Sequence, residues 1–501
     1  MADASSESIQ RLIENSEKGL SQIEMSLPLI LKTRKAIEEA IRNQNDRNVV
    51  LDLMLAVFDT LLAENEVIYD LSASLDALLR ATNDYTKRYY MQSLNLCFWE
   101  SFQLLAGEDG DEDGLLVRLE KLTKEVNQAG CQFLIGHIID DIRAFRKEFA
   151  DKDLRNITRH YDEPIKMYEK QQSLTDIDFF ARGASQLMAI RMEVSVVTAY
   201  LLNLLATNRE TTQNTQKTPS SKKCFDLKGV FNDAIFKALK EKNLKTVVQQ
   251  ALDEGQKRLE ECYSLYMNCG KANEFLIERG CQTPDGFKKM EALLKFRMET
   301  LFMKSDLACS VWGYMNAASD KERSQNLRQI YITKQAALTH LYGYNENARE
   351  KSLWAKIVAM EEANSEKLDT EGVEKSLIEL TSNLAGDRVN SNMYAHYRYK
   401  KDIYIPARLD AFGKMVHYKE LTDTLKLLNV CKSLENYTVG LLYCIDETHK
   451  KESKKQYDEW MGIINNLVAK TGNDERAKEM LRPFRELIEM AYGDDEKSKT
   501  N

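Results

Sequence analysis

The sequence predicts an all-α protein made of two tandem, homologous helical bundles followed by a C-terminal helical extension. Glycine and proline, which most often form turns, number only 21 and 6 in 501 residues. This scarcity favours long helices over many short strands. Apolar residues also recur at helical steps along most of the chain. Finally, the sequences on either side of a polar stretch resemble each other.

Helical periodicity is clearest in three long stretches, residues 51–79, 177–205 and 409–442. In the first, Leu51 and Leu55 begin a series of apolar residues at steps of three to five. The other two carry apolar residues on more than one face, as helices buried in a bundle do. Another amphipathic helix is expected before residue 150, with one side formed by Phe133, Leu134, Ile138, Ile142 and Phe145.

A polar stretch divides the chain. Residues 207–224 are rich in Thr, Gln, Ser and Lys and have almost nothing to bury, which is typical of a flexible linker. We therefore expect a first unit at residues 1–206 and a second unit at residues 225–445. Residues 446–501 are expected to form a C-terminal helical extension and a tail.

The two units match each other in a constant register. Asp70-Leu-Ser-Ala-Ser74 matches Asp306-Leu-Ala-Cys-Ser310, and Leu105-Ala-Gly107 matches Leu341-Tyr-Gly343. Residues 70 and 306, like residues 107 and 343, are 236 positions apart. The same separation places His160-Tyr161 on His396-Tyr397. We interpret this as a duplication; a chance match between two helical sequences is the alternative.

Composition narrows the class of protein. The net charge of −8 argues against a broad nucleic-acid-binding surface but is compatible with a local basic groove. The nine cysteines form no CxxC pair, so we expect reduced core thiols, such as Cys97 and Cys431, and no zinc site. No signal peptide is visible, and no apolar run approaches the roughly 20 residues that span a bilayer. We expect a soluble, cytoplasmic protein without membrane contact.

The most informative segment is 154–164, with the sequence LRNITRHYDEP. It holds Arg155, Asn156 and His160 in the pattern Arg-Asn-x-x-x-His. This pattern, in its helical setting, resembles the signature of the HEPN superfamily. Its members are helical bundles, and many are metal-independent endoribonucleases of toxin, abortive-infection and CRISPR effector systems. The resemblance covers the two units loosely and leaves out the C-terminal extension.

The spacing suits RNA cleavage. On a helix, Asn156 and His160 share a face, so Asn156 can orient the imidazole. Arg155 lies roughly 140° around the helix from His160 and must return on its long side chain. Histidine transfers protons near neutral pH, and arginine binds phosphate oxygens through a planar fork. The resemblance therefore implies that His160 acts as acid or base, Arg155 as phosphate clamp and Asn156 as orienter, without a cofactor.

The second copy of the motif differs from the first. It keeps Asn392 and His396 but has Ser391 where the arginine would stand. Two arrangements remain open. Arg155, His160 and His396 could form one asymmetric site within a chain, or two chains could pair their first units as a homodimer.

Aromatic and basic residues alternate beside the second copy. RNA bases could stack on the aromatic rings next to the basic groups, whereas the plain alternative is a solvated loop that caps a bundle. With Asn392, the candidate substrate-binding residues are Tyr397, Arg398, Lys400 and Lys401.

An acidic loop in the first unit has the spacing of a calcium-binding EF-hand. Asp109, Asp111, Asp113 and Glu120 occupy loop positions 1, 3, 5 and 12, with Gly114 at position 6. The matching stretch of the second unit lacks the pattern, and EF-hands usually work in pairs. An acidic turn between helices is therefore the preferred interpretation, and no metal is expected.

The leading hypothesis is a HEPN-like, metal-independent endoribonuclease that acts on RNA in a toxin or anti-phage defence role. A helical scaffold that binds a protein partner and retains a vestigial motif is the first alternative. A calcium-dependent interaction module is the second.

Overall fold

The computed structural model confirms the all-α class. It describes residues 27, 29–44, 46–107, 114–157, 161–207, 244–278, 285–364, 370–382, 398–399, 402–403, 417–443 and a few positions between 461 and 482. Within these residues, the only strands are β1 (Arg398–Tyr399) and β2 (Asp402–Ile403), which pair antiparallel. The predicted linker, except Thr207, lies outside the described residues, as does most of the C-terminal extension.

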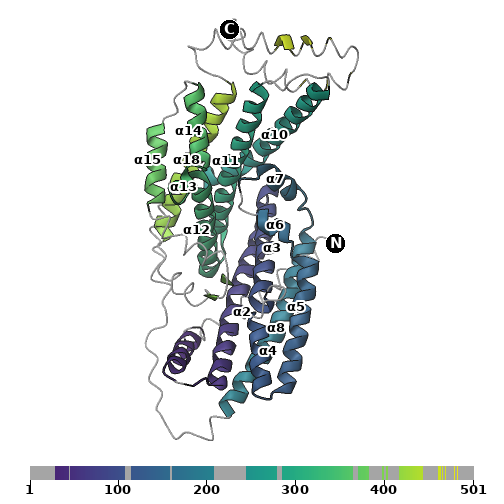
Figure 1. The fold of residues 1–501 in the computed structure, drawn as a ribbon, viewed down its shortest axis with the longest axis vertical. Helices are drawn as coiled ribbons and strands as arrows, with labels where there is room; N and C mark the ends of the chain where they lie inside the picture. Colours follow the sequence, from purple (N-terminus) through teal and green to yellow (C-terminus); the bar gives the residue numbers. More distant parts are fainter. Residues whose placement is uncertain are drawn as a thin grey trace.

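Five helices of the first unit form a bundle (Figure 1). They are α2 (Val49–Arg80), α3 (Asp84–Ala106), α4 (Leu115–Glu125), α5 (Ala129–Phe149) and α8 (Ile177–Thr207). A separate helix over residues 29–42 precedes them.

Asparagine caps begin two helices of the bundle, and aromatic side chains fill its centre. The oxygens of Asn48 and Asn83 accept hydrogen bonds from the first-turn amides of α2 and α3, as helix N-caps do. The ring of Phe98 lies 5.3 Å from that of Phe145 and 6.3 Å from that of Phe180, measured between centroids. Helices α3, α5 and α8 therefore share one aromatic core.

Two short helices, α6 (Lys152–Ile157) and α7 (Pro164–Gln172), connect α5 to α8. Helix α6 lies against α3, and α7 reaches the second unit by packing on α10 (Leu244–Glu278) and α11 (Asp285–Asn316). Helix α7, which follows the Arg-Asn-x-x-x-His motif in the sequence, thus lies where the two units meet.

The second unit packs around α11 (Figure 1). Helices α10, α12 (Asp320–Tyr342) and α18 (His417–Tyr443) contact α11, and α15 (Thr370–Thr381) contacts α12 and α18. The other helices described in this unit are α13 (Glu346–Arg349) and α14 (Leu353–Asn364). Cys431 in α18 and Cys97 in α3 are buried, as predicted.

The helix ends repeat the register seen in the sequence. Helices α2 and α11 end 236 positions apart, and α3 and α12 both begin and end 236 positions apart. Gly107 and Gly343 end α3 and α12 with positive φ angles of 75° and 76°, which glycine adopts without steric cost. These matches agree with the proposed duplication, which stays a prediction.

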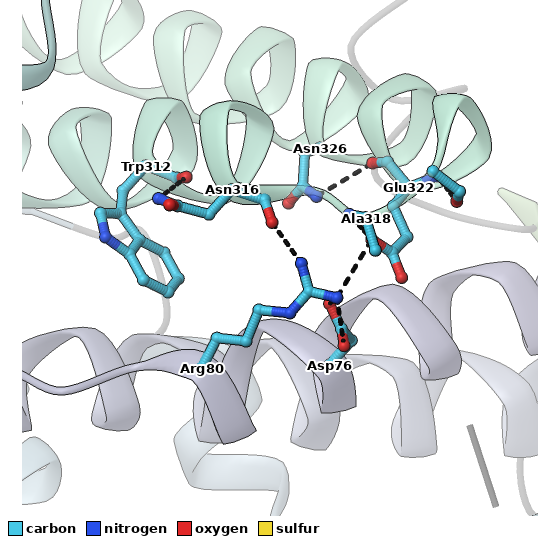
Figure 2. A network of polar contacts seen from close by, with 8 residues as sticks. Asp76, Arg80, Trp312, Asn316, Ala318, Glu322 and Asn326 are labelled. Carbon is cyan, nitrogen blue, oxygen red and sulfur yellow. Dashed lines mark hydrogen bonds and ion pairs between the residues drawn. The ribbon is translucent and has the colours of Figure 1, made fainter. Parts of the chain in front are cut away.

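Buried polar side chains join the two units. Arg328 of α12 donates a hydrogen bond to Asp70 of α2, and both side chains are nearly inaccessible to water. At the end of α2, Arg80 lies between Asp76 of its own helix and the carbonyl oxygen of Asn316 at the end of α11 (Figure 2). Ionised groups buried this way need partners, so these pairs fix how the units meet.

Two sequence predictions about helix surfaces are wrong. Phe133 and Leu134 do not share the buried side of α5, because their exposed fractions are 74% and 51%. That side is formed by Cys131, Ile135, Ile138, Ile139, Ile142, Phe145 and Phe149.

The second wrong prediction concerns α8. Residues 177–205 are long and apolar enough to cross a membrane by length and composition, although no such run was expected. A core helix of a bundle passes the same test, and one face of α8 packs on α2, α3 and α5.

Candidate functional site around Arg155

The position of α6 is set by a pair of hydrogen bonds from α3. The amide group of Asn95 donates to the carbonyl oxygen of Asp151 over 2.9 Å and accepts from its backbone N–H over 2.8 Å. The carboxylate of Asp151 in turn accepts from the backbone N–H of Leu154 over 2.9 Å, which caps the first turn. Although partial burial raises the pKa of Asp151, hydrogen bonds from Lys170 and the Leu154 amide leave it lowered. The cap therefore stays ionised.

Arg155 projects from α6 toward α3. Its Nη2 lies 3.5 Å from Oε1 of Glu100, and its Nη1 donates to Oδ1 of Asn156 over 3.1 Å. The Arg155 side chain is 28% exposed, whereas Glu100 is 4% exposed. The guanidinium thus contacts a buried carboxylate, and the Arg155 side chain stays partly exposed beside the exposed Asn156. A partly exposed arginine can bind an anion.

The residue after His160 in the sequence is anchored in the second unit. The Tyr161 side chain is fully buried, and its hydroxyl donates to Oδ2 of Asp306 on α11 over 3.1 Å. Its ring also lies 5.8 Å from the ring of His340 on α12. Nε2 of His340 lies 2.8 Å from a carboxylate oxygen of Glu299.

Most other predicted site residues lie outside the described residues. They are His160, Asn392, His396, Tyr397, Lys400 and Lys401; for Arg398 only the backbone, in β1, is described. The expected shared face of Asn156 and His160, and the meeting of His160 with His396, therefore stay predictions. Strand β1 and helix α6 both lie against α3, so segments next to both copies of the motif contact the same helix. That helix is about 34 Å long.

Basic side chains near α6 lie on aromatic rings. The guanidinium of Arg146 is 4.5 Å from the centroid of the Phe102 ring and 5.0 Å from that of Trp99, and Nζ of Lys152 is 6.0 Å from Trp99. Such cation–π contacts stabilise positive charge at a partly apolar surface. Together with Arg155, they give the overall acidic chain a local group of cations along α5 and α6.

The acidic loop is only partly described. Asp109, Asp111 and Asp113 lie outside the described residues. Glu120 lies within α4, which begins at Leu115, and its side chain is directed toward Gly136 of α5. Loop position 7 of an EF-hand offers a carbonyl oxygen to the ion, but here residue 115 starts a helix, where carbonyl oxygens accept intrahelical hydrogen bonds. This geometry weighs against calcium, and no cluster of three metal-binding side chains occurs among the residues described.

Comparison of the chain with protein-family models, with curated proteins and with solved structures gives no match. The HEPN resemblance is therefore neither supported nor contradicted by these comparisons.

Two residues that contact the motif segment, Glu100 and Asp306, were not predicted from the sequence. Each is distant in sequence from the residue that it contacts, by 55 and 145 positions. A signal for Glu100 was present, because it is the only charged residue between Tyr89 and Gly107. Lone charges in apolar helices usually face a partner. No sequence signal identifies that partner as Arg155.

Proposed function

We propose that the chain is a HEPN-like, metal-independent endoribonuclease whose site is built on Arg155, Asn156 and His160. The observation that carries the proposal is the placement of Arg155. Its guanidinium contacts the buried Glu100 carboxylate and the Asn156 side chain, yet the Arg155 side chain remains partly exposed. A preorganised cation at a surface is what a phosphodiester in its transition state needs.

The proposed reaction is an internal transfer within RNA. A base takes the proton of a 2′-hydroxyl, and the 2′-oxygen forms a bond to phosphorus. The bond to the 5′-oxygen breaks, and that oxygen receives a proton from an acid. The products are a 2′,3′-cyclic phosphate and a 5′-hydroxyl. Arg155 stabilises the charge on the phosphate oxygens, and His160 provides one of the two proton transfers.

The second proton-transfer group comes from one of two sources. In the intramolecular arrangement His396 supplies it, and Asn392 with Tyr397, Arg398, Lys400 and Lys401 binds the RNA strand. In the homodimer arrangement His160 of a second chain supplies it.

Incubation of the purified full-length chain with single-stranded RNA in EDTA tests the proposal. Products with cyclic phosphate ends are expected from the wild type, whereas His160→Ala and Arg155→Ala should be inactive. Arg143→Ala, which removes an exposed arginine of α5, serves as the matched control and should cleave normally. Cleavage by all variants at the wild-type rate would remove these residues from the mechanism.

A second candidate function is a helical scaffold that binds a protein partner. The pairing of Arg155 with Glu100 favours it, because an arginine with a buried carboxylate partner also has a purely structural role. Absence of RNA cleavage under all conditions, with unaltered folding, would favour the scaffold. The calcium-dependent module has a direct test in calorimetry, where no heat with millimolar calcium rejects it.

A further inference from the structure

We propose that Asp306 of the second unit is a positioning residue for the motif segment of the first unit, acting through Tyr161. The inference concerns the Arg155 site and rests on the proposed function only for its catalytic consequence. Its structural part, that Asp306 of α11 holds the chain at Tyr161, does not depend on any activity.

Asp306 is a buried carboxylate that accepts two hydrogen bonds from the first unit. Its side chain is 1% exposed, and each of its two oxygens accepts one of these bonds. Tyr85 donates to Oδ1 over 2.7 Å, and Tyr161 donates to Oδ2 over 3.1 Å. A buried carboxylate needs such donors, since hydrogen bonds to an ionised group are stronger than neutral ones.

The two donors, Tyr85 and Tyr161, are both buried tyrosines. Burial, followed by the nearby charge of Asp306, raises the pKa of Tyr85 well above its usual range. The hydroxyl therefore keeps its proton and remains a donor at neutral pH. Tyr161 is equally inaccessible to water and is further confined by the ring of His340.

Hydrogen bonds from other helices hold the chain on both sides of the motif, at Asp151 and at Tyr161. Asn95 of α3 fixes its beginning at Asp151, and Asp306 of α11 fixes it again at Tyr161. Arg155 lies between these two anchors, and His160 precedes the second one in sequence. One anchor belongs to the first unit and the other to the second, so the position of the motif depends on how the two units meet.

This assigns a role to the second unit that does not require its own motif to be active. The copy at residues 391–396 has Ser391 in place of the arginine, so it lacks the residue that serves as phosphate clamp in the first copy. The unit would still be needed, because Asp306 orients the segment that carries the intact copy. A displacement of about 1 Å at a reacting group is enough to reduce a rate about a hundredfold.

The decisive variants are Tyr161→Phe and Tyr85→Phe in the full chain. Each removes one hydroxyl from the same carboxylate and keeps the ring that fills the core, but only Tyr161 belongs to the motif segment. Hydrogen exchange of the amides in α6 and in the first turn of α7 is the readout that needs no activity. It should rise roughly tenfold in Tyr161→Phe, as expected for loss of one hydrogen bond to a charged group. Exchange in α6 should stay unchanged in Tyr85→Phe; α7 is left out of this comparison because the Tyr85 hydroxyl also interacts with the side chain of Gln171 in α7.

Turnover gives the second readout. In Tyr161→Phe, kcat on RNA should fall about tenfold or more with KM within twofold of the wild type, because position rather than binding is lost. Equal exchange in α6 for Tyr161→Phe and Tyr85→Phe would overturn the inference. If exchange rises as expected but the wild type does not cleave RNA, the anchor stands and the proposed nuclease fails.

Discussion

The guanidinium of Arg80 donates a hydrogen bond to the backbone carbonyl oxygen of Asn316, and these two residues are 236 positions apart (Figure 2). Each is the last residue of its helix, α2 or α11. The register that aligns the two units in sequence therefore also joins equivalent positions in space. Contact between equivalent residues is expected near the axis of a pseudo-twofold arrangement, as in an isologous dimer.

Arg80→Met should lower the free energy of unfolding by about 1–2 kcal/mol. The substitution removes a charged donor from an orphan carbonyl at the C-terminus of α11 and breaks the ion pair with Asp76. Chemical denaturation of the full chain measures it. Arg182→Met on α8 removes an exposed arginine and should change little. An equal effect from both variants would show that the Asn316 contact contributes nothing specific.

Periodicity predicted the helices but could not decide which side of α5 is buried. Ile135 and Ile139, which face the core, are as apolar as the neighbouring Phe133 and Leu134, so this stretch is apolar on two sides. Which side is covered depends on the tertiary packing of α4 and α8 against α5. A helix apolar all round gives no directional signal.

The candidate site shows the same division between local and distant information. The Arg155 and Asn156 pair was visible in the sequence because its spacing is local. The contacts of the segment with Glu100 and Asp306 come from other helices, and one of these lies in the other unit. Single-sequence patterns carry no information on such pairing, because any of several lone charges could have been the partner.

Stability should fall as pH rises through neutrality, and Glu64 should cause part of this. Burial raises the pKa of Glu64 to about 8, despite the opposing effects of Arg191 and the Ser195 hydroxyl. A pKa raised on folding gives stability that is complete below the unfolded value of 4.5 and is lost as pH approaches 8. One such group contributes up to about 1.4 kcal/mol per pH unit in this window.

Urea unfolding of Glu64→Gln from about pH 5.5 to pH 7.5 tests this. The amide keeps an acceptor for Ser195 but cannot ionise, so the variant should lose up to about 3 kcal/mol less than the wild type over this range. Glu193→Gln, at an exposed position of α8, is the control and should follow the wild type. Burial also raises the pKa of Glu66 to about 8, so some pH dependence should remain.

Loss of the anion from a buried ion network in the second unit should strongly lower the free energy of unfolding. Glu435 of α18 is fully buried and accepts hydrogen bonds from Lys304, over 2.7 Å, and from Arg258. Burial alone would raise its pKa, but these two cations keep the pKa of Glu435 lowered. Glu435→Gln leaves Lys304 buried without its anion and should cost about 3–5 kcal/mol.

The double variant Glu435→Leu with Lys304→Met separates charge imbalance from packing. Because it removes the buried anion and the more deeply buried cation together, it should be more stable than Glu435→Gln in the same denaturation assay. A double variant as unstable as the single one would show that the network is needed for shape rather than for charge balance.

Truncation of two phenylalanines on α5 should change the free energy of unfolding by very different amounts. This difference tests which side of the helix is buried. Phe145 is fully buried, with its ring 5.3 Å from Phe98 and 5.4 Å from Phe149, so Phe145→Ala opens a cavity and should cost about 3–5 kcal/mol. Phe133 is 74% exposed, and Phe133→Ala should change the free energy of unfolding by less than about 0.5 kcal/mol. Denaturation at protein concentrations from micromolar to tens of micromolar measures both. A large loss from Phe133→Ala that grows with concentration would mean that this residue is covered by another chain in solution.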